Sequence, residues 1–250
     1  MATRFSSLLP VLLLAACVPD ERPKPSPVTE GARSAPRPPE VPPPRGAAAA
    51  PEDPALTAVF RDGFDRPALG PDWNSTSPVW RIDGGRLCGQ GAKNHPVWLK
   101  RRLPANARVE FDAETRSPDG DLKAEFWGDG RSAATTVSYT AATSYLTIFG
   151  GWKNQFHVLA RIDEHALDRP EIRLDDSNDD PRTRRVLPGR PYRFKVVRED
   201  GKTIHWSVDD LEILSFADPR PLAGPGHEHF GLNDWDVPVC FDNLVVTPLP

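Results

Sequence analysis

The stretch between residues 203 and 247 constrains the fold more than any other part of the chain. Its first residues alternate apolar and polar side chains, with Ile204, Trp206 and Val208 as the apolar members. A period of two is typical of a strand with one buried face. A turn at Asp209-Asp210 then returns the chain as a second apolar run over 211–216. Such a strand pair needs further strands to pack against, so the sequence predicts a β-rich domain.

Earlier segments supply these partners. Short apolar runs recur along the chain, and turn signals such as Pro118-Asp119-Gly120 and Gly150-Gly151 separate them, while no segment keeps a helical period. We expect a strand–turn–strand over 79–88 and further strands over 96–103, 107–115, 121–128, 135–141, 144–150, 155–162 and 192–199. Many short strands with regular turns predict an all-β, two-sheet antiparallel sandwich over residues 57–250.

The residues before position 57 have a different composition. Residues 18–55 hold twelve of the chain's 29 prolines, whereas all seven tryptophans lie later. Such a segment cannot bury a core, and its Pro-Pro steps favour extended polyproline conformations. We therefore expect a disordered Pro-rich linker over 17–56 and one domain over 57–250. The net charge of −4 gives no electrostatic case for binding nucleic acid.

The first sixteen residues have the layout of a secretory signal. Arg4 precedes an apolar run that is too short to cross a bilayer as a mature helix. The run ends in Leu14-Ala15-Ala16-Cys17, which resembles the bacterial lipobox and implies cleavage before Cys17 with lipid attached to its sulfur. An ordinary signal cut near Ala16 is the alternative. Val18 after the cysteine favours the outer membrane, with the domain on the periplasmic or the surface face.

Motifs at both ends of the domain are familiar. Phe64-Asp65-Arg66 and Trp80-Arg81-Ile82 near its start, and Trp206-Ser207-Val208 and Phe241-Asp242-Asn243 near its end, resemble concanavalin A-like lectin/glucanase (laminin-G-like) jelly rolls. The resemblance covers nearly all of residues 58–250 and implies a jelly-roll fold. That superfamily contains lectins, glycosidases and adhesion modules, so the resemblance leaves the function open.

Three alternating acids form one candidate site. Glu110, Asp112 and Glu114 share a face of their expected strand and resemble the Glu-x-Asp-x-Glu motif of family-16 glycosidases. The resemblance implies Glu110 as nucleophile, Asp112 as its helper and Glu114 as general acid/base. A retaining mechanism needs two carboxyl groups about 5 Å apart, which alternate strand positions can supply. The alternative is a charged, solvated face, which Lys123 and Glu125 on the neighbouring strand favour.

Aromatic and polar side chains at outward positions or near turns form the stronger binding signal. Aromatic rings stack on the C–H faces of sugars, and amides can bond to hydroxyl groups. The sequence therefore predicts a sugar-binding surface drawn from Trp127, Tyr145, Trp152, His157, Asn233 and Trp235. The alternative for each of these residues is packing under a loop or at an end of the sandwich.

The segment 175–180 concentrates carboxylates in a loop. Calcium prefers oxygen ligands, so Asp176, Asn178 and Asp180 are its candidate ligands and calcium is the one cofactor left open. Pro181 replaces the glycine that an EF-hand loop needs, which excludes that motif. The arginines that follow favour a solvated acidic loop as the alternative.

The two cysteines after Cys17 are Cys88 and Cys240, both on expected strands. Disulfides persist outside the cytoplasm, which favours a bridge between an early strand and the last one. Two separate buried thiols are the alternative.

These observations lead to one main interpretation and two rivals. The main one is a monomeric, envelope-anchored lipoprotein that touches the membrane through its lipid only and whose lectin-like domain binds a glycan or another cell-envelope component. A glycoside hydrolase would place Glu110 and Glu114 in an open cleft beside tryptophans. An adhesion or structural module would present a flat polar face without convergent aromatic side chains.

Overall fold

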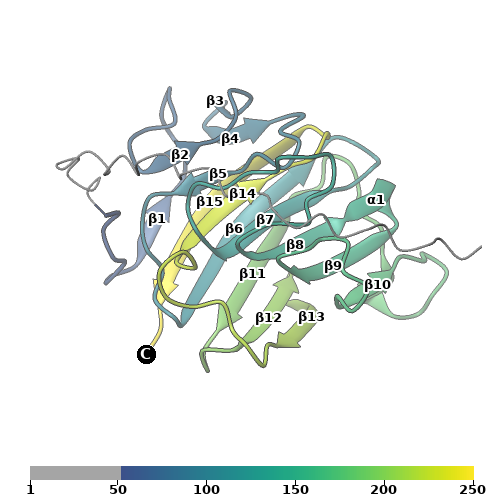
Figure 1. Ribbon diagram of the computed structural model, residues 1–250. Helices are drawn as coiled ribbons and strands as arrows, with labels where there is room; N and C mark the ends of the chain where they lie inside the picture. The colour runs from purple at the N-terminus through teal and green to yellow at the C-terminus, as the bar shows by residue number, and fades with distance from the viewer. Residues whose placement is uncertain (1–51) are drawn as a thin grey trace, which may run out of the picture. The chain divides into compact units, whose positions relative to one another are not determined.

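Two antiparallel sheets pack face to face in the computed structural model, which describes residues 52–250 (Figure 1). The signal at 1–16, Cys17 and the linker up to residue 51 lie outside the described residues. The all-β, jelly-roll sandwich expected from the sequence is confirmed. Within residues 52–250 no helix is long and apolar enough to cross a membrane.

The larger sheet has eight strands. Seven follow one another in the order β13 (Leu211–Ala217), β12 (Thr203–Val208), β11 (Tyr192–Arg198), β6 (Ala107–Thr115), β15 (Val239–Pro248), β4 (Arg86–Gly89) and β3 (Arg81–Asp83). The eighth, β1 (Phe60–Asp62), pairs with the later part of β15. In Figure 1 the yellow β15 runs beside β6, so the last strand of the chain occupies the middle of this sheet.

The smaller sheet has seven strands. Their order is β10 (Glu171–Arg173), β9 (Phe156–Arg161), β8 (Tyr145–Gly150), β7 (Leu122–Gly128), β14 (His229–Asn233), β5 (Val97–Leu99) and β2 (Trp73–Ser75). The short helical turns α1 (Gly151–Asn154) and η1 (Pro181–Thr183) lie outside the sheets. The closing stretch 203–247 thus contributes strands to both layers.

The core lies between the two sheets, and the alternating side chains of β6 show how it is built. Val109, Phe111 and Ala113 are buried there, as their period of two predicts. The ring of Phe111 stacks on Phe194 of the same sheet at 4.9 Å and meets Phe230 of the other sheet at 5.7 Å. Each such buried ring contributes roughly 2–3 kcal/mol to the stability of the sandwich.

A second apolar cluster covers the outer face of the smaller sheet. Ala134, Tyr139 and Ala142 of the segment between β7 and β8 pack on Leu146 and other side chains of β8 and β9. The strand expected over 135–141 is wrong. Val137 and Tyr139 alternate with polar residues as in a strand, but no strand pairs with this segment, which is a loop with Tyr139 buried and Val137 exposed. The loop makes the smaller sheet the middle layer of three, so β7 is buried along its whole length.

The folded unit begins earlier than the expected boundary at residue 57. The backbone of Leu56 donates to the carbonyl of Arg102 at 2.8 Å, and Arg102 donates to the carbonyl of Pro54 at 2.9 Å. Leu56 itself is buried. Residues 52–56 of the expected linker are therefore part of the folded unit.

A disulfide joins Cys88 and Cys240, the alternative that the sequence favoured. The two residues lie directly opposite each other in the β4–β15 ladder, with Cα atoms 4.1 Å apart. The bridge ties the early part of the larger sheet to its central strand.

Candidate functional site

A left-handed turn after β8 carries Trp152, which packs against the apolar cluster on the outer face of the smaller sheet. Trp152, Lys153 and Asn154 have φ angles of 53°, 59° and 60°, a run that L-residues avoid because each costs about 1–2 kcal/mol. Gly150 enters the turn at φ 77°, where a Cβ atom would lie 2.6 Å from Val186. Such strain persists only where the surroundings determine it, which they do here through Asn154.

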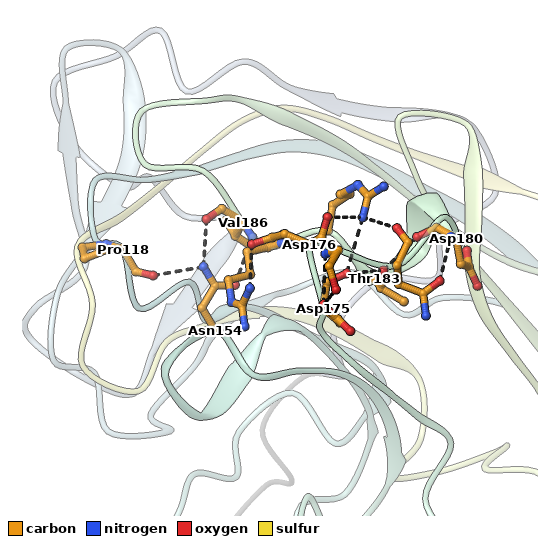
Figure 2. Close-up of polar contacts among 11 residues, drawn as sticks. Pro118, Asn154, Asp175, Asp176, Asp180, Thr183 and Val186 are labelled. Atoms are coloured by element: carbon orange, nitrogen blue, oxygen red, sulfur yellow. Dashed lines mark hydrogen bonds and ion pairs between the residues drawn. The ribbon is translucent and has the colours of Figure 1, made fainter.

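Asn154 holds this turn in place (Figure 2). Its side chain is buried and donates to the carbonyls of Pro118 at 3.0 Å and Val186 at 2.8 Å, while its Oδ1 accepts from the backbone of Val186 at 3.0 Å. The turn is therefore fixed to two separate loops. Trp152 has its ring 4.5 Å from the guanidinium of Arg169.

Trp235 is presented by the loop between β14 and β15. Its ring lies 4.5 Å from the ammonium of Lys93, which also pairs with Asp236 at 2.7 Å. The loop is fixed from below by the buried carboxylate of Asp234, which accepts backbone hydrogen bonds from Ala92 at 3.1 Å and Val237 at 3.0 Å. Burial raises the pKa of Asp234 to about 7, against the effect of these hydrogen bonds.

The sheet registers bring the two tryptophans together. Strand β7 pairs with β8 on one side and β14 on the other, and Asp121 immediately precedes it. The backbone of Asp121 donates to the carbonyl of Gly150 at 2.9 Å, and hydrogen bonding from the backbone of Trp235 stabilises its carboxylate. Asp121 therefore lies between the segments that carry Trp152 and Trp235.

Between these segments is a cavity of about 400 Å³ over the outer face of the smaller sheet. Trp152, Trp235, Ile148 and Val137 contribute apolar surface to it. Its polar lining comes from Asp119, Asp121, Lys123, Ser138, Lys153, Glu164, His165 and Asp236. The arrangement combines two half-buried indole rings with several hydrogen-bonding groups.

The floor of the cavity is a buried ion pair. Lys123 is 3% exposed and donates to Glu164 at 2.8 Å and to Asn94 at 2.7 Å. Its pKa is raised: burial alone would lower it, but the carboxylates of Asp121 and Glu164 outweigh that effect. Lys123 is therefore a charged but internally neutralised group.

Beside this floor, on the same face of β7, Glu125 organises a second polar group. Its carboxylate accepts hydrogen bonds from Ser144 at 2.5 Å, Tyr139 at 3.2 Å and Asn233 at 2.7 Å. Burial raises the pKa of Glu125 to about 7 against these hydrogen bonds. The solvated face expected for Lys123 and Glu125 is wrong, because the loop over 129–144 covers them.

The six predicted sugar-binding residues divide into three groups. Trp152 and Trp235 line the cavity. Asn233 is on the same face, but it is fully buried and its amide is bonded to Glu125. Trp127, Tyr145 and His157 are buried, so the outward positions expected for them are wrong.

Each of these three has a local cause for facing inward. Trp127 has φ 53° at a β-bulge between β7 and β14, which turns its ring into the core that even-numbered residues of β7 otherwise face. Tyr145 lies opposite the core residue Phe126. His157 stacks on Phe149 at 4.0 Å and accepts from the backbone of Gly150, and burial lowers its pKa to about 3.

The acids Glu110, Asp112 and Glu114 lie on the outer face of the larger sheet, away from the cavity. They form ion pairs with Arg108, Arg193 and Arg86 at 3.0, 3.1 and 3.0 Å. Along a regular strand the first and last of them are about 13 Å apart at the backbone. The hollows that Asp112 and Glu114 line contain no aromatic side chain, in contrast to the cleft expected for a hydrolase.

The acidic loop is held by arginines (Figure 2). Asp176 pairs with Arg185 at 2.6 Å and Asp180 pairs with Arg182 at 2.6 Å, while the side chain of Asn178 accepts from the backbone of Asp180. No group of three acidic, histidine or cysteine side chains able to hold a metal ion occurs between residues 52 and 250. The carboxylates of Asp176 and Asp180 are thus engaged by arginines, and calcium binding by this loop stays a prediction.

Asp121, Glu164 and His165 are cavity residues that sequence reasoning missed. A usable signal existed for the cavity floor, because Lys123 and Glu125 interrupt an otherwise apolar strand, as paired buried charges do. No local signal marks Asp121 or His165, since their role depends on which loops meet.

Comparison with solved structures gives the same fold in proteins of low sequence identity. The carbohydrate-binding module CBM66 from Bacillus subtilis aligns with 70% of this chain and 95% of its own, with a TM-score of 0.51 and 14% identity. A protein of unknown function with a galectin-like fold, also from Bacillus subtilis, aligns with 76% of this chain and 96% of its own, with a TM-score of 0.52 and 15% identity.

The carbohydrate recognition domain of Emp47p aligns with 77% of this chain and 96% of its own, with a TM-score of 0.51 and 12% identity. No protein-family model matches the sequence, and no curated protein matches it either. The structural likenesses show that the domain has the concanavalin A-like, galectin-like jelly-roll fold that its motifs implied.

Proposed function

We propose that the domain binds a glycan in the cavity between Trp152 and Trp235. The observation that carries this proposal is the convergence of two half-buried indole rings on one cavity that also presents carboxylate, ammonium and imidazole groups. Sugars have the complementary surface, with apolar C–H faces edged by hydroxyl groups. The cavity volume of about 400 Å³ lies within the range of small-molecule sites.

The contacts of the two rings support the same function. Lys93 and Arg169 each lie over one of the rings, and neither lines the cavity. The cations therefore restrain the rings from outside and leave their cavity side to a ligand. A rigid platform loses little conformational entropy on binding, which favours measurable affinity for a weakly apolar ligand.

The neighbouring folds agree with this proposal. The module CBM66 and the Emp47p domain are described as carbohydrate-binding and carbohydrate-recognition domains, and this chain shares their architecture. Because fold alone does not determine function, the cavity and not the likeness carries the argument.

A glycan array followed by titration of the purified protein tests the proposal. We expect saturable binding of at least one glycan and a loss of tenfold or more in affinity for Trp152→Ala and for Trp235→Ala. Leu187→Ala, which removes an exposed apolar side chain that does not line the cavity, is the matched control and should bind as the wild type does. A glycan that binds both tryptophan variants with unchanged affinity would place the site elsewhere and overturn the proposal.

The cellular setting is a second part of the proposal. The resemblance of Leu14-Ala15-Ala16-Cys17 to a lipobox supports an exported protein whose domain is tethered to a bacterial membrane, the outer membrane being favoured. The proline-rich residues that follow would act as the tether. The ligand would then be a glycan or another component of the cell envelope.

A further inference from the structure

We propose that the cavity selects a saccharide that carries a free amine, an amino sugar, and that Asp121 is the residue that binds its ammonium group. This inference rests on the proposed glycan-binding function and names the class of its ligand. It follows from the charges that remain in the cavity once the internal ion pairs are formed.

Most charged groups of the cavity are already paired. Lys123 is bonded to Glu164 at 2.8 Å, and Asp236 is bonded to Lys93 at 2.7 Å. His165 lies 3.4 Å from Glu164. Among residues 52–250, no ion pair involves the three remaining groups, which are Asp119, Asp121 and Lys153. Two carboxylates against one ammonium leave the cavity with an excess of negative charge. A ligand with a carboxylate or sulfate group would meet repulsion there, whereas an ammonium group would be attracted.

Asp121 is the central one of these groups. Asp119 and Lys153 are exposed at the rim, but Asp121 is half-buried between the two tryptophan-bearing segments. Its backbone bond to Gly150 fixes it beside the turn of Trp152, and the backbone of Trp235 lies on its other side. A sugar ring resting against the indoles would therefore bring its substituents to this carboxylate.

The chemistry of Asp121 favours a charged donor. An ionised carboxylate only accepts hydrogen bonds, and a bond from an ammonium is about twice as strong as one from a neutral hydroxyl. The pKa of Asp121 is raised by its burial, an effect that Lys123 opposes and Glu164 reinforces, so its charge is incompletely compensated by the protein. An ammonium near the indole faces gains further cation–π attraction.

Titration calorimetry with three β-1,4-linked oligosaccharides of equal length tests the inference. One series carries free amines (glucosamine), one is N-acetylated, and one has hydroxyl groups in the same position (glucose). We expect the wild-type protein to bind the free-amine series about tenfold more tightly than the other two, the difference made by one charge-assisted hydrogen bond. Spermidine serves as a non-sugar amine and should bind far more weakly.

The variant Asp121→Asn should remove the preference for the amine while it keeps affinity for the neutral series within about threefold. Asp83→Asn, which neutralises an exposed carboxylate on the larger sheet, is the matched control and should keep the preference. The comparison of the three series on the wild-type protein does not depend on how well either variant folds.

The outcomes separate the two proposals. Equal binding of the three series would overturn the selection of amines and leave glycan binding in place. Spermidine binding as tightly as the amino sugar would overturn the assignment to a saccharide. An absence of binding to all three series, together with a blank glycan array, would overturn the proposed function itself.

Discussion

Asn154 and Val186 are bonded to each other twice: the backbone N–H of Val186 donates to Asn154 Oδ1 at 3.0 Å, and Asn154 Nδ2 donates to the Val186 carbonyl at 2.8 Å. The side-chain amide of Asn154 thus pairs with the backbone N–H and C=O of Val186, as the backbone of a neighbouring strand would. It connects the strained turn that presents Trp152 to the segment that follows η1, which makes that segment a support of the cavity wall.

We expect Asn154→Ala to destabilise the domain by about 2–3 kcal/mol, because it leaves buried backbone groups without partners. Glycan affinity should fall as well, since the turn of Trp152 loses its support. Urea denaturation and titration measure the two effects. Gln155→Ala, an exposed position in the same turn, should change stability by less than about 0.5 kcal/mol. An Asn154→Ala protein as stable as this control would refute the role of the side chain.

We expect Lys123→Met to cost about 3–5 kcal/mol, because it leaves the carboxylate of Glu164 buried beside Asp121 without its counter-ion. The double variant Lys123→Met/Glu164→Gln should recover part of this loss, and a double-mutant cycle by chemical denaturation measures the recovery. Lys153→Met, at an exposed lysine of the same cavity, is the control. Strictly additive single effects would mean that the two side chains do not stabilise each other.

The buried Glu125 should lower the free energy of unfolding as the pH rises. Its pKa is about 7 in the folded state against 4.5 in the unfolded chain, so the folded state holds an extra proton between these values and loses stability as pH rises through that window. The shift corresponds to a free energy on the order of 3 kcal/mol.

The comparison with Glu125→Gln isolates this contribution. Between pH 5 and pH 8 the unfolding free energy of the wild type should fall relative to that of the variant. His157 acts in the opposite direction, because its lowered pKa removes stability as pH falls below 6.5, and it is common to both proteins. A difference between the two proteins that stays constant over this range would contradict the prediction.

Loss of the disulfide should destabilise the domain without changing its fold. Cys88 and Cys240 are separated by 152 residues, and a crosslink that closes so long a loop contributes roughly 2–5 kcal/mol. We expect Cys88→Ala/Cys240→Ala to unfold at a lower temperature than the oxidised wild type. Dithiothreitol should lower the unfolding temperature of the wild type to that of the variant and should not change the unfolding temperature of the variant. If dithiothreitol does not change the unfolding temperature of the wild type, the bridge adds no stability.

Lipid attachment at Cys17 is tested by metabolic labelling with a radioactive fatty acid. The wild type should carry the label and sediment with membranes, whereas Cys17→Ser should do neither. Cys88→Ala removes a different cysteine and should keep both properties. Label that persists on Cys17→Ser would exclude the lipobox interpretation.

Much of the sandwich could be predicted from the sequence because alternation reports burial directly. Val109, Phe111 and Ala113 face the core as their spacing indicates. The same rule failed at Trp127, where a bulge shifts the phase by one residue, and a bulge leaves no clear trace in one sequence. It also failed for the segment 135–141, where Tyr139 covers a sheet instead of joining one.

The cavity could be predicted only in part. Trp152 and Trp235 carry recognisable signals, since aromatic residues beside glycines and turns often reach the surface. Their convergence depends on β7 lying between β8 and β14, an order that the sequence does not state. Asp121 acquires its place from that strand order alone. Long-range topology, and not residue type, was the missing information.

The central position of β15 has a consequence for the timing of folding. Strand β15 pairs with β6 on one side and with β4 and β1 on the other, so the larger sheet lacks its middle until residues 239–248 have emerged. Pairings between such distant segments form slowly. The larger sheet of a nascent chain therefore stays incomplete until β15 has been synthesised, and a truncation before residue 239 would remove the centre of a layer instead of trimming its edge.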